Sequence, residues 1–234
     1  MEKDDGRLRA ESEGGVNENA SSSVWSLSDF DKKAFSEKEL REAIFNFIDL
    51  KDKYTAQHCL NVAGYAGKIA RMAGFSERGA LVVKHAGLLH DIGKVLIDKS
   101  ILLKKGRLTE AEFYQMQSHP EKGMRCLSMF DLREEIVDAA WHHHERYDGK
   151  GYPDGLSGTG IMLPTRIITV CDIVDAMRSS RPYSKGKSLD EIIDELERVR
   201  GEQTDPGITD LMITYLQEEK EKEDKDENKL IMIV

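Results

Sequence analysis

The chain has few cysteines and lacks any long apolar segment. Cys59, Cys126 and Cys171 are odd in number and far apart in its 234 residues, which argues against a disulfide framework and favours a reducing compartment. No early segment has a basic start followed by an apolar stretch, and no apolar run approaches the length that crosses a membrane. We therefore expect a soluble cytoplasmic protein without a membrane partner.

An excess of positive charge is also lacking. The formal net charge is −9, of which residues 1–36 and residues 217–229 contribute −3 each, leaving −3 for the middle of the chain. This balance excludes the basic surface typical of proteins that bind nucleic-acid polymers. Both charged ends are typical of solvated chain. We expect a disordered tail over 1–35, a domain over 36–217 and a charged extension over 218–234.

Alternation typical of strands is hard to find, and helical periodicity covers nearly all of the chain from Ser36 onward. Residues 146–163, with five glycines and a proline, form the one segment without a regular pattern. A loop of this length inside a compact domain is usually functional. The predicted fold class is all-α. Cap and stop signals place helices at about 36–50, 55–73, 76 to before Gly93, after Thr109, from Pro120 with His119 as its cap, 132–145, 164–180, after Ser188 and from Pro206.

Two histidines of this helical pattern face the expected core. His58 lies on the apolar stripe that continues through Val62. His90 follows Val83 at a spacing of seven residues, so it also points inward, and Asp91 adjoins it. A His-Asp pair at an apolar helix end is costly unless something pairs with it. A divalent metal would do so.

Three consecutive histidines occupy positions 142–144. Consecutive helical residues lie about 100° apart, so three side chains cannot share one direction. His143 and His144 straddle the stripe that contains Ala140, whereas His142 follows acidic residues at helical spacing. We expect His143 and His144 to face a buried site and His142 to face outward. A helix that ended early, near residue 141, would instead turn His142 inward and His144 out.

A carboxylate lies in a helix that is apolar almost all round. Asp172 is flanked by apolar residues over 167–174, and Asp175 lies one turn away on a similar face. A buried carboxylate needs a partner. That partner is a metal if the inward histidines converge on Asp172, or an arginine such as Arg166 or Arg181 if they do not.

The inward side chains form a set that is too large for one metal ion. Five imidazoles and two carboxylates suit two adjacent ions that a carboxylate bridges, with open positions for water and substrate. Imidazole-rich ligation favours Fe, Mn or Zn over Mg, which prefers oxygen ligands. The set consists of His58, His90, Asp91, His119, His143, His144 and Asp172.

At these residues the sequence resembles the HD-GYP family, HD-domain phosphodiesterases that hydrolyse cyclic di-GMP. The resemblance covers about residues 50–215 and implies the family's all-helical HD fold with its GYP loop. It rests on segments that follow one another in the family's order: HDIGK (90–94), His-Pro-x-x-Gly (119–123), HHE (143–145), DGKGYP (148–153) and DIVDAMRSSRPY (172–183).

The resemblance implies roles for single residues. All seven members of the set would be metal ligands, and Asp91 would be the bridging carboxylate of the catalytic centre. Lys94 and Arg181 match positions that contact the phosphates of the substrate, and Tyr152 matches the tyrosine of the GYP loop. An ammonium group at Lys94 would also neutralise charge that grows on the phosphoryl group, which makes Lys94 a second catalytic candidate.

The chain departs from the family pattern at three places. Asp98 and Lys99 stand where the family usually has a proline, and Ser184 stands where a basic residue is common, which weakens the expected phosphate contact. Tyr54 occupies the position of a glutamate that holds a third metal in some members. The tyrosine favours two metals here, and recruitment of a third by the substrate or by another acid stays open.

These features predict a cyclic di-GMP phosphodiesterase. A hydroxide that bridges two metals would attack one phosphodiester to give the linear dinucleotide pGpG, and a second hydrolysis would give GMP. Two rivals remain: an HD-superfamily phosphohydrolase that acts on a dNTP or an alarmone, and a sensor that binds the cyclic dinucleotide without hydrolysing it. The GYP loop disfavours the first, and the complete ligand set disfavours the second. A signalling partner or a second copy of the chain stays open.

Overall fold

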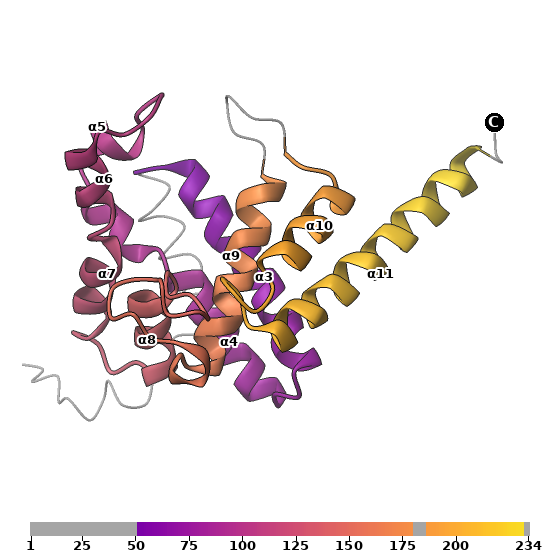
Figure 1. The fold of residues 1–234 in the computed structure, drawn as a ribbon, viewed down its shortest axis with the longest axis horizontal. Helices are drawn as coiled ribbons and strands as arrows, with labels where there is room; N and C mark the ends of the chain where they lie inside the picture. Colours follow the sequence, from indigo (N-terminus) through magenta and orange to yellow (C-terminus); the bar gives the residue numbers. More distant parts are fainter. Residues whose placement is uncertain (1–50, 180–185, 232–234) are drawn as a thin grey trace, which may run out of the picture. The chain divides into compact units, whose positions relative to one another are not determined.

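The computed structural model describes residues 51–179 and 186–231, with side chains through residue 225 (Figure 1). The chain divides into two units, Met1–Ala34 and Phe35–Val234, and every described residue belongs to the second. The tail expected over 1–35, the helix expected over 36–50, Arg181 and Ser184 lie outside the described residues.

The described part of the chain is helical, which confirms the all-α class. It contains no β-strand, and its extended pairing is limited to an isolated bridge between Arg200 and Thr204. None of its helices combines the length and the apolarity that a membrane crossing requires. The elements are α3 (Lys53–Met72), α4 (Glu77–Leu89), η1 (Ile92–Leu96), α5 (Lys99–Leu102), α6 (Glu110–Met116), α7 (His119–Leu127), α8 (Glu134–His142), η2 (Gly158–Gly160), α9 (Leu163–Arg178), α10 (Leu189–Val199) and α11 (Pro206–Ile231).

Three predicted helix starts are confirmed by their capping residues. Thr109 and Glu112 form a reciprocal capping box at the start of α6, in which each side chain accepts a hydrogen bond from the other's backbone. Ser188 and Glu191 do the same for α10, and the hydroxyl of Ser76 caps α4. These side chains satisfy amide groups that a helix leaves without partners in its first turn.

Several predicted boundaries were wrong by one to three residues, and three of them have a visible cause or bear on the site. Asp52, and not Thr55, caps α3, because its carboxylate accepts hydrogen bonds from two backbone amides of the first turn. The helix α7 begins at His119, so Ser118 holds the cap position. The helix α8 ends at His142, three residues before the expected end.

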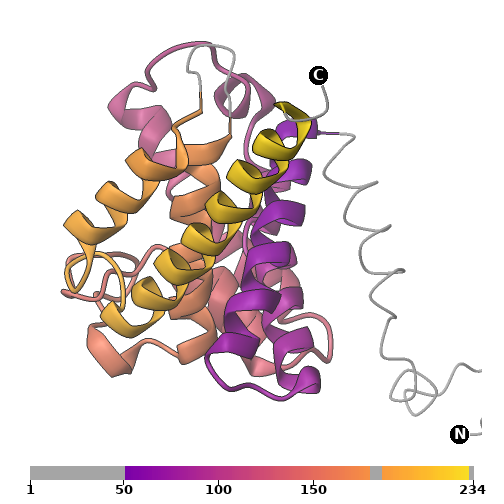
Figure 2. The same cartoon turned by 90° about the vertical axis from the view of Figure 1, so that its right-hand side faces the viewer.

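The helix α9 lies in the centre of the described bundle (Figure 1) and packs against α3, α4, α8, α10 and α11. Ile167, Ile168, Val170, Cys171 and Val174 are completely buried and Ile173 is partly buried, which explains why the sequence of α9 is apolar almost all round. The helix α11 runs beside α3 (Figure 2) and also contacts α9 and α10. It continues without a break from Pro206 to Ile231, through the domain boundary expected after residue 217.

Gly93 lets the segment after α4 lie directly against α7. A Cβ atom at this position would lie 1.9 Å from the carbonyl oxygen of His119 and 2.6 Å from the amide nitrogen of Gly123, so no other residue fits there. The helix α4 ends at Leu89, and Gly93 lies inside the short 3₁₀-helix η1. The glycine therefore acts by close packing, which places Asp91 beside His119.

Candidate metal centre

The structure brings all seven expected ligands together from five separate segments. Three overlapping groups have nitrogen and oxygen atoms within 4.8 Å of one another in the described part of the chain. The residues come from the second turn of α3, the end of α4, the start of α7, the end of α8 and the middle of α9. The groups are His58, His90 and Asp172; His119, His143 and His144; and His90, Asp91 and His143.

Asp91 lies between the first two groups. Its Oδ2 atom is 3.6 Å from Nε2 of His58 and 3.4 Å from Nε2 of His90. Its Oδ1 atom is 3.2 Å from Nε2 of His119 and 3.7 Å from Nε2 of His143. The side chain is 1 % exposed. One oxygen therefore faces each group, as a carboxylate shared between two cations would.

Asp175 fixes the orientation of His58. Its Oδ2 atom lies 2.7 Å from Nδ1 of His58, and its Oδ1 atom accepts a hydrogen bond of 2.8 Å from Asn61. Nε2 of His58 then points to Oδ1 of Asp172 at 3.1 Å. A carboxylate behind a histidine sets the ring's tautomer and direction. The sequence analysis gave Asp175 no role, although its spacing of one turn from Asp172 was the signal.

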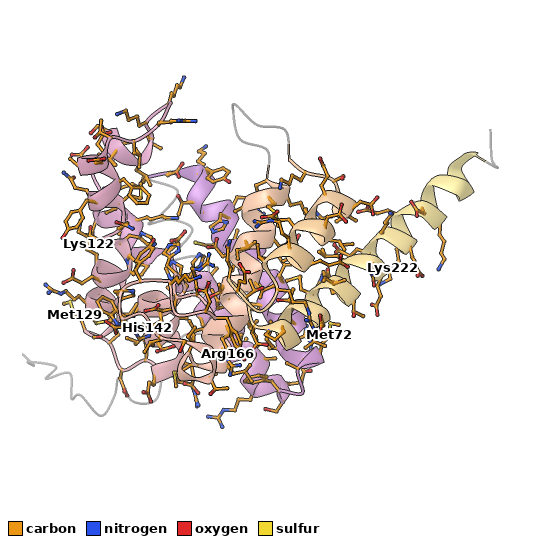
Figure 3. The ribbon with its side chains drawn as sticks, in the orientation of Figure 1. Met72, Lys122, Met129, His142, Arg166 and Lys222 are labelled. Atoms are coloured by element: carbon orange, nitrogen blue, oxygen red, sulfur yellow. The ribbon has the colours of Figure 1, made fainter. Side chains whose placement is uncertain are left out.

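The salt bridge considered for Asp172 does not form with Arg166. Arg166, which Figure 3 labels, pairs with Asp205 and donates to the carbonyl oxygen of Ile161, while Arg181 lies outside the described residues. The side chain of Asp172 is 22 % exposed, so it is not fully buried as expected. It lies at the open edge of the ligand groups.

Three histidines hold their Nδ1 atoms against main-chain carbonyl oxygens of the preceding helical turn. These distances are 2.7 Å for His90, 2.8 Å for His119 and 2.9 Å for His143. A carbonyl oxygen only accepts hydrogen bonds, so each Nδ1 carries the proton. In the neutral ring, the lone pair then belongs to Nε2, which faces the centre of the site.

This arrangement fits a bound cation. Nε2 of His119 lies 3.2 Å from Nε2 of His143 and 3.2 Å from Nε2 of His144. Because His119 and His143 already use their protons at Nδ1, the two neutral rings place lone pairs against each other. Nε2 of His90 and Oδ1 of Asp91 are also buried without a hydrogen-bond partner. A transition-metal ion satisfies such imidazole and carboxylate atoms together.

The two groups have opposite protonation tendencies. Burial, together with the neighbouring imidazoles, lowers the pKa of His143 well below its usual value, and burial and His119 lower the pKa of His144 to about 4. Burial also opposes a charge on His58, but hydrogen bonds to Asp172 and Asp175 outweigh it and raise the pKa of His58 to about 10. His58 therefore attracts a proton, whereas His143 and His144 stay neutral at neutral pH.

Lys94 lies at the edge of the centre. Its Nζ atom is 2.5 Å from Oδ2 of Asp91, and its side chain is 24 % exposed. Burial opposes its charge, but Asp91 and Asp172 outweigh burial and raise the pKa of Lys94. The ammonium group therefore stays charged beside the expected ligands, on a side chain that is partly exposed.

The loop after α8 places Tyr152 on the metal centre. The rings of Tyr152 and His144 stack with centroids 4.9 Å apart and an angle of 20° between their planes. Gly151 permits this contact, since a Cβ atom there would lie 2.4 Å from the amide nitrogen of Arg146. Burial raises the pKa of Tyr152 to about 12. The phenol is therefore neutral and keeps its hydroxyl proton.

His142 faces away from the metal centre, as the helical phase predicted. Its Nδ1 atom lies 2.6 Å from Oδ1 of Asp138, and its Nε2 atom lies 3.1 Å from Oδ2 of Asp154. The early end of α8 does not turn it inward. The sequence analysis also gave no role to Glu145, which is 1 % exposed and accepts hydrogen bonds from the amides of Asp154 and Gly155.

Two departures from the family pattern have visible local effects. Asp98 caps the short helix α5, because its carboxylate accepts a hydrogen bond of 2.7 Å from the amide of Ser100. Tyr54 lies in the first turn of α3 and is 36 % exposed. It brings no carboxylate to the position one turn before His58.

An all-helical bundle with converging histidines and aspartates defines the class of metal-binding HD domains. A model of the HD domain family matches residues 35–208, and the chain belongs to this family. The chain also has relatives among the HD-GYP phosphodiesterases, which confirms the resemblance found in the sequence.

Three curated relatives illustrate this similarity. The cyclic di-GMP phosphodiesterase response regulator RpfG of Xanthomonas campestris is 39% identical over 179 residues, 76% of this chain and 47% of the relative. A cyclic di-GMP phosphodiesterase of Thermotoga maritima is 38% identical over 197 residues, 81% of this chain and 53% of the relative. The 3'3'-cGAMP-specific phosphodiesterase 2 of Vibrio cholerae is 34% identical over 183 residues, with 77% and 35% covered. The chain thus spans about half or less of these relatives.

Solved structures share the fold. Bd1817, an HDG"Y"P protein from Bdellovibrio bacteriovorus, has a TM-score of 0.56 at 13% identity and covers 77% of this chain and 62% of its own. The HD domain of the phosphodiesterase PgpH from L. monocytogenes has a TM-score of 0.56 at 23% identity, covering 74% of this chain and 94% of its own. At these identities the likeness concerns the fold.

Proposed function

We propose that this chain is a metal-dependent phosphodiesterase that hydrolyses a cyclic dinucleotide, with cyclic di-GMP as its substrate. The observation that carries the proposal is the position of Asp91 between two groups of ligands, one oxygen facing each. Two relatives at 38–39% identity bear the name cyclic di-GMP phosphodiesterase. A two-cation centre suits an in-line displacement at phosphorus.

Each ligand group would hold one of two divalent ions, with Asp91 shared between them. Iron or manganese suits the mixed imidazole and carboxylate donors, and zinc accepts the same ligands. When bound, such ions activate the attacking water and stabilise the charge that develops at phosphorus. The first ion would use His58, His90 and Asp172, and the second would use His119, His143 and His144.

The remaining side chains bind and orient the substrate. The ammonium of Lys94, partly open to solvent beside Asp91, contacts a phosphate and neutralises charge on it in the transition state. The neutral phenol of Tyr152 presents a ring face and a hydroxyl donor above His144. Arg181 contacts a phosphate, a role that its place in the RPY segment implies.

The reaction opens the dinucleotide ring. The oxygen of the attacking water forms a bond to phosphorus, and the ester bond to the ribose oxygen breaks, so that this oxygen leaves as a hydroxyl group. One hydrolysis of cyclic di-GMP gives pGpG, and a second gives GMP.

A second candidate substrate is 3'3'-cGAMP. Two relatives from Vibrio cholerae named as 3'3'-cGAMP-specific phosphodiesterases are 34% and 39% identical to the chain, as similar as the relatives named for cyclic di-GMP. The two substrates differ in one base and share both phosphodiesters, so the metal centre suits either. The residues that contact the bases would decide between them.

A substrate panel tests the proposal. The chain is purified anaerobically, its metals are quantified, and cyclic di-GMP, 3'3'-cGAMP and a dNTP are incubated with it and analysed by chromatography. We expect pGpG from cyclic di-GMP in the presence of Fe or Mn. Hydrolysis of the dNTP alone, or tight binding of cyclic di-GMP without turnover across Fe, Mn and Zn, would contradict the proposal.

A further inference from the structure

The segment 142–145 directs its side chains to two different places. His143 and His144 face the metal centre, whereas His142 and Glu145 face the loop that follows. The proposed hydrolysis uses the first pair alone. The second pair, together with Trp141, has no assigned role.

His142 connects three parts of the fold. Its Nδ1 atom contacts Asp138 one turn earlier in α8, and the other oxygen of Asp138 accepts a hydrogen bond from Thr165 of α9. Its Nε2 atom contacts Asp154 of the loop. Contacts with the helices therefore fix the Nδ1 side of the ring, and its Nε2 side holds the loop.

Asp154 makes several hydrogen bonds to the end of α8 although its side chain is exposed. Its side chain is 49 % exposed, yet Oδ2 receives both Nε2 of His142 at 3.1 Å and Nε1 of Trp141 at 3.0 Å. Its backbone amide donates to the buried carboxylate of Glu145 at 2.7 Å. Side chain and backbone are thus both tied to the end of α8.

Tyr152 lies two residues before this point. Its amide nitrogen is 3.3 Å from the carbonyl oxygen of His144, and its ring stacks on the His144 ring. Holding the chain at Asp154 restricts the positions that the Tyr152 ring can take. We propose that Trp141, His142 and Asp154 form a loop anchor that positions Tyr152 for substrate binding.

This inference rests on the proposed function and extends it to positioning residues outside the metal centre. The contacts of the loop anchor involve neither Lys94 nor the Nε2 atoms of the expected metal ligands. Its loss should therefore weaken substrate binding and leave the reacting groups in place. We expect KM for the cyclic dinucleotide to rise about three- to tenfold, below the roughly hundredfold loss that a 1 Å misplacement of a reacting group causes.

A double-mutant cycle tests the anchor. His142→Ala, Asp154→Ala and the double variant are compared with wild type in the full chain by metal content, melting temperature, kcat and KM. His142→Gln keeps a side-chain donor for Asp154 and tests rescue, and Glu134→Ala, an exposed change on the same helix, serves as the control. Residues that act as one unit show non-additive effects.

The expected result is a raised KM in both single variants, with kcat and metal content near those of wild type. The double variant should be no worse than either single variant, and His142→Gln should recover most of the loss. Loss of metal from His142→Ala, or a lower melting temperature with unchanged KM, would overturn the loop anchor while the proposed function stood. Absence of both binding and turnover in wild type would overturn the proposed function, and the inference with it.

Discussion

The two sides of the metal centre differ in chemistry although Asp91 joins them. The carboxylate half (His58, His90 and Asp172) contains an acid and has a second acid, Asp175, behind His58. The imidazole half (His119, His143 and His144) contains three rings, two of which donate Nδ1 protons to main-chain carbonyl oxygens. In the carboxylate half, a carboxylate orients His58 and the carbonyl oxygen of Gly87 orients His90, whereas in the imidazole half only main-chain carbonyl oxygens hold the oriented rings.

This difference shows how the ligands of each half are oriented for a cation and how much negative charge they bring to it. Carboxylates add negative charge and so strengthen cation binding, but they also attract protons, which compete. Backbone carbonyl oxygens orient the rings without adding a full charge. We therefore expect the carboxylate half to respond more to pH and to charge-removing substitutions than the imidazole half.

The largest effect should come from removing the residue that the two halves share. Asp91→Ala removes an oxygen from each half and the negative charge between them. Both ions should be lost together, and hydrolysis of cyclic di-GMP should collapse. Elemental analysis and product chromatography check this expectation. A variant that kept its metals and near-normal turnover would contradict the two-ion arrangement.

Substitutions within one half should separate the halves. Asp172→Ala should empty the carboxylate half and His144→Ala the imidazole half, so each variant should retain about one ion of two. Hydrolysis should fall by orders of magnitude in both, because the reaction needs both halves. The measurement is metal content per chain beside the initial rate. Equal loss of both ions from either variant would show that the halves do not bind independently.

Much of this arrangement was predictable from the sequence, for a physical reason. Helical periodicity shows which side of a helix is buried, so it placed His58 and His90 inward and His142 outward from sequence spacing alone. Capping residues such as Ser188 fixed helix starts, because their hydroxyl groups satisfy local amides. These signals are local, and they need no knowledge of the neighbouring helices.

Contacts between distant segments were not predictable in this way. Asp175 meets His58 across 117 positions, and the sequence showed no more than its spacing from Asp172. Glu145 supports the loop by binding backbone amides, which leave no pattern of residue types. The early end of α8 was missed because no glycine or proline stands between His142 and Asp148 to mark it.

A smaller effect is expected from the acid behind His58. Asp175→Asn keeps the shape of the side chain but removes its charge, so it weakens the hold on the His58 ring. Changes of this kind typically cost about ten- to hundredfold in metal affinity. The loss of metal affinity should be confined to the carboxylate half. Competition with a metal-binding dye in the His144→Ala background, which retains that half, would measure it. The matched control is Asp210→Asn, a carboxylate that pairs with Arg200 away from the centre. Unchanged affinity would remove Asp175 from the site.

The pH should affect the two halves differently. With its pKa raised to about 10, His58 carries a proton at neutral pH, and a metal must displace that proton. Affinity of the carboxylate half should therefore rise with pH, by up to about tenfold per unit, until the pH reaches that pKa. In the imidazole half, the pKa of His144 is lowered to about 4, so little proton competition remains above pH 6.5. Metal titrations between pH 6.5 and 9 should show metal affinity rising with pH in His144→Ala, which retains the carboxylate half. Affinity should change little in Asp172→Ala, which retains the imidazole half. Equal slopes of affinity against pH in the two variants would contradict the comparison.

The smallest effect on metal content is expected from Lys94→Ala, although hydrolysis should slow. The ammonium contacts Asp91 from outside the two halves, and the side chain is partly exposed, so we expect it to bind no metal and to contact a phosphate. Removing it should leave both ions in place and lower kcat roughly a hundredfold, as the loss of one group that stabilises transition-state charge typically does. Lys105→Ala, a change of the same kind at an exposed position, should leave kcat as in wild type. Loss of metal from Lys94→Ala would contradict this expectation. It would mean that the lysine holds the bridging carboxylate of Asp91 in position between the halves, rather than contacting the substrate.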